Sequence, residues 1–135
     1  MRAFQFHGVR RWLVAGSVIL AACSSSPTGP GIQPQIINST DNFQYQISNI
    51  QNYSGAQVYT WQNTGTTATV NQAASIAAGS ATLVLRDANG VEVYNHSLSD
   101  NGTFSSSAGT AGGWTVRVTY TATSATVNFR ADKGP

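Results

Sequence analysis

The sequence is poor in the residues on which most enzymes, metal sites and nucleic-acid-binding surfaces depend. Of its 135 residues, one is cysteine and two are histidine, and Asp, Glu, Lys and Arg together make up 9% of the chain. A single cysteine excludes a disulfide framework and any zinc site built from cysteines. The length suits one domain rather than two.

Basic residues are also scarcer than the formal net charge of +2 suggests, because three of the seven stand within the first eleven positions. Without residues 1–22, interpreted below as a leader, four basic residues remain against five acidic ones, a net charge of −1. Nucleic-acid binding needs clustered Lys and Arg. We therefore expect no nucleic acid among the partners.

The first 23 residues have the three parts of a secretory signal. Three early arginines precede an apolar run over residues 12–20, and Leu20-Ala21-Ala22-Cys23 follows. The apolar run is far shorter than the roughly 20 residues that a membrane-spanning helix requires. The last four residues resemble the lipobox of bacterial lipoproteins, in which a peptidase cleaves before a cysteine that carries a diacylglycerol.

This resemblance implies that residues 1–22 are removed and that Cys23 is the lipid attachment site, so the cysteine is neither a nucleophile nor a redox centre. Several acyl chains hold a protein on a membrane far more firmly than one. By resemblance to enterobacterial lipoproteins, Ser24 after the cysteine implies the outer membrane, on a periplasmic or surface face.

Two alternatives compete with this interpretation of the leader. In one, a short apolar segment is followed by a cysteine through coincidence. In the other, Arg10-Arg11 belongs to a twin-arginine signal, but the rest of that motif is missing, so ordinary export is favoured.

The lipoprotein interpretation divides the chain into three segments: a signal peptide over residues 1–22, the lipidated Cys23 with a tether over 23–35, and one domain over 36–135. The tether is rich in Ser, Gly and Pro and has no apolar periodicity. Such a composition is typical of a flexible to extended linker.

Within the domain, apolar residues alternate with polar ones, which indicates strands rather than helices. Asn-Gly and other turn signals separate the apolar stretches, and Ala88-Asn89-Gly90 is typical of a tight hairpin. A short helical turn is conceivable only within residues 72–79. We predict about eight strands, near residues 43–50, 56–63, 66–72, 80–86, 91–97, 102–106, 113–121 and 125–131.

Short strands at about ten-residue spacing predict an all-β protein with a single antiparallel β-sandwich, jelly-roll-like or Ig-like. No disulfide is available, so apolar packing alone has to hold the fold together. The predicted core consists of Phe43, Ile47, Val58, Leu83, Leu85, Val93, Trp114, Val116, Val118, Val127 and Phe129.

A longer pattern covers about half of the domain. Ala81, Leu83, Leu85, Asp87 and Asn89-Gly90 are followed by a polar stretch and then by Gly113, Trp114, Val116 and Val118. This pattern resembles the pre-peptidase C-terminal domains, which are β-sandwiches found on exported enzymes or on the cell surface. The resemblance implies an accessory or interaction domain rather than a catalyst. Some members of that group bind calcium or polysaccharide, but no ligand set carries over residue by residue.

The chain offers little for catalysis, which needs convergent ionisable groups. After the leader, His96 is the only histidine and Glu92 the only glutamate, and no Gly-x-Ser-x-Gly motif is present. We therefore expect neither an enzyme nor a cofactor. Asp87 and Asn89, with Asp100 if the loops meet, are the candidates for calcium, but the further carboxylates of a calcium loop are missing. We therefore expect no metal.

Two groups of side chains are candidates for ligand binding. Tyr59 and Trp61 lie on one face of their strand: outward rings would form a surface on which sugars stack, whereas inward rings would belong to the core, which we favour. Arg86, Arg117 and Arg130 lie on the polar side of their strands and form either an anion or polysaccharide surface or a solvated outer face.

These observations leave two functions from different classes. We favour a non-catalytic, membrane-anchored accessory domain that contacts another protein of the cell envelope. The alternative is a carbohydrate-binding module at the cell surface. The orientation of Tyr59 and Trp61 distinguishes them, because inward rings favour the interaction domain.

Overall fold

The structure, a computed structural model, describes residues 32–135. The predictions on the signal peptide, on Cys23 and on most of the tether lie outside these residues. The described part is all-β, as predicted, and contains no helix, so none that is long and apolar enough to cross a membrane. Its seven strands are β1 (Gln35–Ser39), β2 (Asn42–Asn63), β3 (Ala68–Gln72), β4 (Ser75–Arg86), β5 (Glu92–Ser97), β6 (Gly102–Ser105) and β7 (Gly112–Lys133).

The strand count differs from the predicted eight because the chain stays extended where loops were expected. Two predicted pairs, 43–50 with 56–63 and 113–121 with 125–131, are each one continuous strand, β2 and β7. The predicted strands did not include β1, and the segment considered for a helical turn is largely the start of β4.

Both long strands bend at their middle. In β2 the register with β7 shifts between Ile47 and Gly55, where Asn49 (φ 58°) and Asn52 (φ 45°) adopt left-handed backbone conformations. Ala122 (φ 45°) does the same in β7. Asparagine tolerates this conformation better than most residues, and irregularities of this kind bend a strand sharply.

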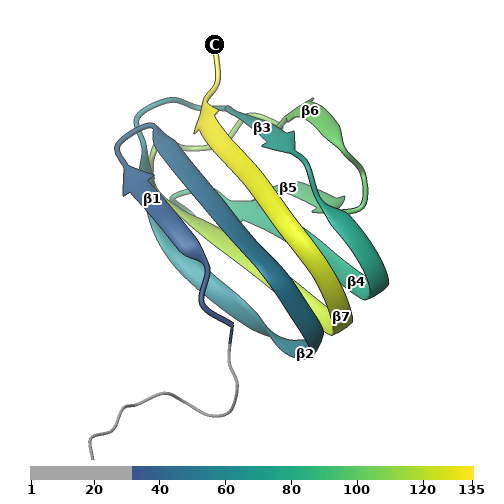
Figure 1. Cartoon of the computed structure of the whole chain (residues 1–135). Helices are drawn as coiled ribbons and strands as arrows, with labels where there is room; N and C mark the ends of the chain where they lie inside the picture. The colour runs from purple at the N-terminus through teal and green to yellow at the C-terminus, as the bar shows by residue number, and fades with distance from the viewer. Residues whose placement is uncertain (1–31) are drawn as a thin grey trace, which may run out of the picture. The chain divides into compact units, whose positions relative to one another are not determined.

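These bends fold one antiparallel sheet of seven strands over on itself, so that two layers face each other (Figure 1). The first layer contains β1, the first half of β2 (42–50), the second half of β7 (125–133), β3 and β6. The second layer contains the second half of β2 (55–63), the first half of β7 (112–121), β5 and most of β4 (80–86). The first residues of β4 pair instead with the second half of β7, and the strand bends at Gly79 (φ 73°).

The core lies between the two layers and is rich in aromatic rings. Trp61 and Trp114 meet edge to face at 5.9 Å, and Tyr45 stacks on Phe129 at 4.9 Å. All predicted core residues are buried except Val58, which is 54% exposed. The prediction of Val58 was wrong because Tyr59 and Trp61 share the inward side of the second half of β2, which turns the residue between them outward.

Candidate binding surfaces

The two aromatic residues predicted as a possible sugar-stacking surface point inward. Trp61 is fully buried, and Tyr59 is half-buried with its ring 5.5 Å from that of Phe43. The indole nitrogen of Trp61 has no hydrogen-bond partner within residues 32–135. Of the two ring orientations that the sequence left open, the structure shows the inward one. No sugar can therefore stack on the Trp61 ring.

Tyr59 instead belongs to a hydrogen-bonded network between the layers, which the sequence did not predict. The hydroxyls of Tyr45 and Tyr120 are 2.6 Å apart. Tyr45 and Tyr59 both donate to the side-chain oxygen of Gln57, at 2.7 and 3.1 Å. Burial raises the pKa of Tyr120 to about 12 and also raises that of Tyr45, so these groups stay neutral at physiological pH. The network connects the two layers.

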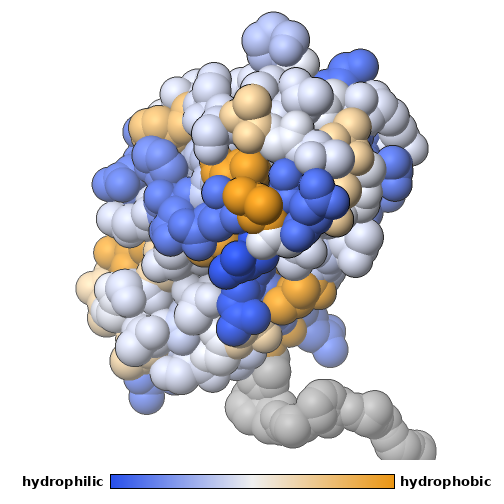
Figure 2. Space-filling view, turned by 180° about the vertical axis from the view of Figure 1, so that it is seen from behind, coloured by the Kyte–Doolittle hydropathy of each residue, from blue (hydrophilic) through white to orange (hydrophobic). Residues whose placement is uncertain are grey.

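The three predicted arginines do not share one surface. Arg86 and Arg117 lie on the outer face of the second layer, whereas Arg130 lies on the outer face of the first. Figure 2 views the molecule from the side of the second layer, where hydrophobic and hydrophilic surface alternate. Val58 and Val84 flank Arg117 there, one on each neighbouring strand. The three arginines therefore do not form one continuous face.

The three calcium candidates are not brought together either. The Asp87 carboxylate accepts backbone N–H groups from Val91, Thr110 and Asn89 at 2.8–2.9 Å, and these bonds hold its pKa below the usual range. Asp100 follows β5, at the end of that strand opposite to Asp87. No group of three His, Cys, Asp or Glu side chains within residues 32–135 could hold a metal ion. The geometry gives Asp87 a role in the turn.

His96, the histidine of the domain, is part of an aromatic stack. Its ring lies 4.6 Å from that of Tyr94 and 4.4 Å from that of Phe104, and its Nδ1 is 4.0 Å from the Asp100 carboxylate. Tyr94 in turn donates to the buried side chain of Gln72. This stack joins β5 to β6, and the His96 ring contributes to it as a packed aromatic side chain.

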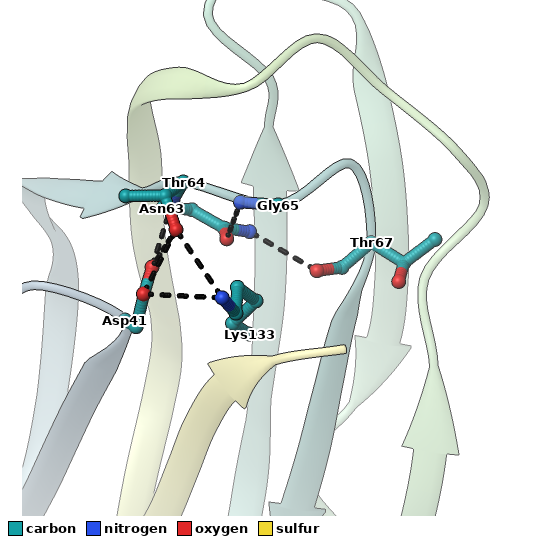
Figure 3. Close-up of polar contacts among 6 residues, drawn as sticks. All are labelled: Asp41, Asn63, Thr64, Gly65, Thr67 and Lys133. Atoms are coloured by element: carbon teal, nitrogen blue, oxygen red, sulfur yellow. Dashed lines mark hydrogen bonds and ion pairs between the residues drawn. The ribbon is translucent and has the colours of Figure 1, made fainter. Parts of the chain in front are cut away.

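A polar cluster fastens the loops at the end of the domain where β7 finishes (Figure 3). The carboxylate of Asp41, a residue with φ 67°, accepts the backbone N–H of Thr64 at 2.7 Å and lies 3.6 Å from Lys133 Nζ. The Thr64 N–H lowers the pKa of Asp41. Buried Asn63 donates to Thr67 O and accepts from Gly65 N. The side chains of Asp41, Asn63, Thr64 and Lys133 all have partners within the cluster, whereas the buried hydroxyl of Thr67 has none within residues 32–135. These contacts give the cluster a structural role, because they tie the ends of β2 and β7 together.

The outer face of the first layer is dominated by amide side chains. Gln35, Gln46 and Asn128 stand opposite one another on β1, β2 and β7. A hollow of about 360 Å³ is lined by Gln33, Gln35, Gln46, Ile47 and Ser48. A second hollow, of about 170 Å³, is lined by Gln35, Ile37, Gln44, Tyr45, Gln46 and Asn128. The sequence analysis did not single out these residues, although the Gln alternation over 44–46 is visible in it.

The second half of β2 has an unpaired edge. It pairs with β7 on one side only, and on its other side the carbonyls of Thr60 and Gln62 accept from the Asn38 side chain and the Asp41 N–H. Backbone groups of alternate residues in a strand point to the same side. The N–H and C=O groups of Ala56 and Val58 therefore point away from β7, where no strand of the described domain pairs with them.

Comparisons with known proteins add no assignment, because no family model and no curated protein matches this chain.

Proposed function

We propose that this protein is a non-catalytic lipoprotein of the bacterial cell envelope, anchored through acyl chains on Cys23, with an interaction domain that contacts another envelope protein. The outer membrane is the proposed location. The order of leader, Leu20-Ala21-Ala22-Cys23 and Ser/Pro/Gly-rich tether supports the anchor. The folded-over sheet supports a β-sandwich of the jelly-roll or Ig-like kind, in agreement with the proposed accessory role.

The observation that carries the proposed interaction is the unpaired edge of β2 over residues 56–60. An exposed strand edge binds another strand through its backbone N–H and C=O groups unless charge, proline or a bulge blocks it. Residues 55–63 contain no charge and no proline, and no register shift occurs there. Val58 adds an apolar side chain that is 54% exposed. We therefore propose that an uncharged, extended segment of the partner adds to the second layer at this edge.

The beginning of the domain agrees with this arrangement. Gln35 pairs with Gln46, close to the bend of β2, and Ile32 O accepts a hydrogen bond from Gln57 on the second half of that strand. An extended chain spans about 3.3–3.6 Å per residue, so Cys23 lies at most about 30 Å from Ile32. The proposed anchor thus keeps the β2 edge near the membrane surface, within reach of other envelope proteins.

The anchor is tested by metabolic labelling with a fatty-acid analogue. We expect the wild-type chain to incorporate the label and to lack residues 1–22, and Cys23→Ala to incorporate none. Ser24→Ala is the matched control and keeps the label, because the cysteine is intact. Equal labelling of Cys23→Ala and wild type, or an intact Met1 on the mature protein, contradicts the proposal.

The β2 edge is tested by two substitutions that place the same charge on opposite sides of Arg117. Val58 and Val84 both face Arg117, but Val58 lies on the edge strand and Val84 on a strand paired on both sides. We expect Val58→Glu to lose a partner that both wild type and Val84→Glu capture from envelope extracts, because a charge at the edge blocks strand addition. Equal capture by Val58→Glu contradicts the edge as the contact, and equal loss in Val84→Glu contradicts its specificity.

For the alternative function, a carbohydrate-binding module, the residues first considered do not form a common binding site. Trp61 is buried, and Arg130 lies on a different layer from Arg86 and Arg117. Carbohydrate binding through Tyr59, Trp61 and the three arginines is therefore not proposed.

A further inference from the structure

We propose that the outer face of the first layer binds a neutral polyhydroxylated chain, that is, an uncharged polysaccharide. This amide face is defined by Gln35, Ile37, Gln44, Gln46, Asn128 and Arg130. It lies on the opposite layer from the β2 edge, so the inference is independent of the protein contact proposed above.

The arrangement of the amide face comes from the strand register. Gln35, Gln46 and Asn128 form one row across β1, β2 and β7, and Ile37, Gln44 and Arg130 form the next. Same-face residues along a strand are about 7 Å apart and neighbouring strands about 4.8 Å apart. The two hollows share Gln35 and Gln46, so they lie next to each other along the first row.

The chemistry of the amide face fits sugar hydroxyls. Each Gln or Asn side chain offers two N–H donors and a carbonyl acceptor, and a hydroxyl both donates and accepts. Within residues 32–135, the side chains of Gln35, Gln46 and Asn128 have no hydrogen-bond partner, so their groups are available. Ile37 is 55% exposed beside them and offers an apolar contact to the C–H side of a sugar ring.

Neutrality of the ligand follows from the charges on the amide face. Arg130 is its one cation, and the Arg130 Nε donates to Asp132 Oδ2 at 2.8 Å. A phosphate or carboxylate polymer needs clustered, unpaired cations, and the described part of this face has none. An extended peptide would bind at a strand edge, whereas the hollows open on the face of the layer.

Part of the amide face is held in place by its own hydrogen bonds. Gln44 Nε2 donates to Asn42 Oδ1 at 3.1 Å, and the Asn42 amide donates in turn to the Asp132 carboxylate that Arg130 also contacts. Side chains fixed before binding lose less conformational freedom when a ligand arrives. The fixed Gln44 row thus lies beside the row of available amides.

The test measures binding of the full chain, in mild detergent, to immobilised neutral glucans, mannans and galactans, with acidic polygalacturonate and hyaluronate beside them. We expect saturable binding to at least one neutral polymer and none to the acidic ones. The double variant Gln46→Ala, Asn128→Ala should bind at least about tenfold more weakly, the loss expected for two hydrogen bonds. Asn95→Ala, which removes an amide from the outer face of the second layer, is the matched control and should bind as wild type does.

The outcomes separate this inference from the protein contact. Absence of saturable binding to every neutral polymer overturns it, as does full binding by a double variant with a wild-type circular dichroism spectrum. Binding restricted to the acidic polymers and lost in Arg130→Gln overturns the claim of neutrality. Val58→Glu should bind the polymer normally, so a failure of the β2 edge and a failure of the amide face give different results.

Discussion

Replacing Trp114 by alanine is expected to lower the free energy of unfolding by about 3–5 kcal/mol, the usual cost of removing a buried aromatic side chain. Trp114 is fully buried, meets Trp61 edge to face, and donates its indole N–H to Thr110 O at 2.8 Å. The substitution leaves a cavity between the layers and removes one of the two hydrogen bonds to Thr110 O, which keeps the one from the Ala88 N–H. Urea denaturation of wild type and variant measures the change, and a loss below about 1 kcal/mol would show that this ring is not part of the core.

The two tryptophans provide an internal comparison. Trp61 is equally buried, but its indole N–H has no partner within residues 32–135. Phenylalanine removes the N–H in both cases, so only Trp114→Phe breaks a hydrogen bond, which contributes about 1 kcal/mol. We therefore expect Trp114→Phe to cost about 1 kcal/mol more than Trp61→Phe. Equal costs would contradict the role of the Thr110 bond.

Gly79→Ala is expected to destabilise the domain by more than about 2 kcal/mol, because a left-handed residue with a side chain costs roughly 1–2 kcal/mol even in open space. Gly79 (φ 73°) lies at the bend of β4, and a Cβ there would overlap the carbonyl oxygens of Thr121 and Ala122. These are backbone atoms of the β7 bend, and they cannot move away without disturbing the pairing of β4 with β7.

Gly90→Ala is the matched control for this effect. Gly90 has φ 83°, but a Cβ there meets no atom within 4 Å. The substitution therefore measures the conformational cost alone, about 1 kcal/mol. Chemical denaturation of both variants separates the two contributions. Similar losses would mean that the β4 and β7 bends are not in close contact.

Local patterns in the sequence predicted most of the fold. Alternation over Leu83–Leu85 and Trp114–Val118 identified strands and their buried sides, and Asn89-Gly90 identified a hairpin between β4 and β5. These features depend on neighbouring residues only. β2 and β7 each continue through a bend, and the bends contain residues with left-handed backbone conformations, such as Asn49 and Ala122. An alternation pattern does not reveal these conformations.

The candidate surfaces were less predictable, because they depend on which layer each strand segment joins. Arg117 and Arg130 lie on the same strand, each between two buried residues, yet the bend of β7 places them on opposite layers. Similarly, the amide face combines Gln35 with Asn128, which are 93 positions apart in the sequence. Nothing local to either residue indicates that β2 brings them into one row.

The central claim is that a partner strand pairs with the unpaired edge of β2, and residue-resolved amide hydrogen exchange tests it most directly. In the free chain, the N–H groups of Ala56 and Val58 should exchange fast, whereas those of Gln57 and Tyr59, which point toward β7, should exchange slowly. On addition of the envelope protein captured by wild type but not by Val58→Glu, we predict that exchange at Ala56 and Val58 slows to the rates of their neighbours. Fast exchange at both positions in the complex would contradict the claim.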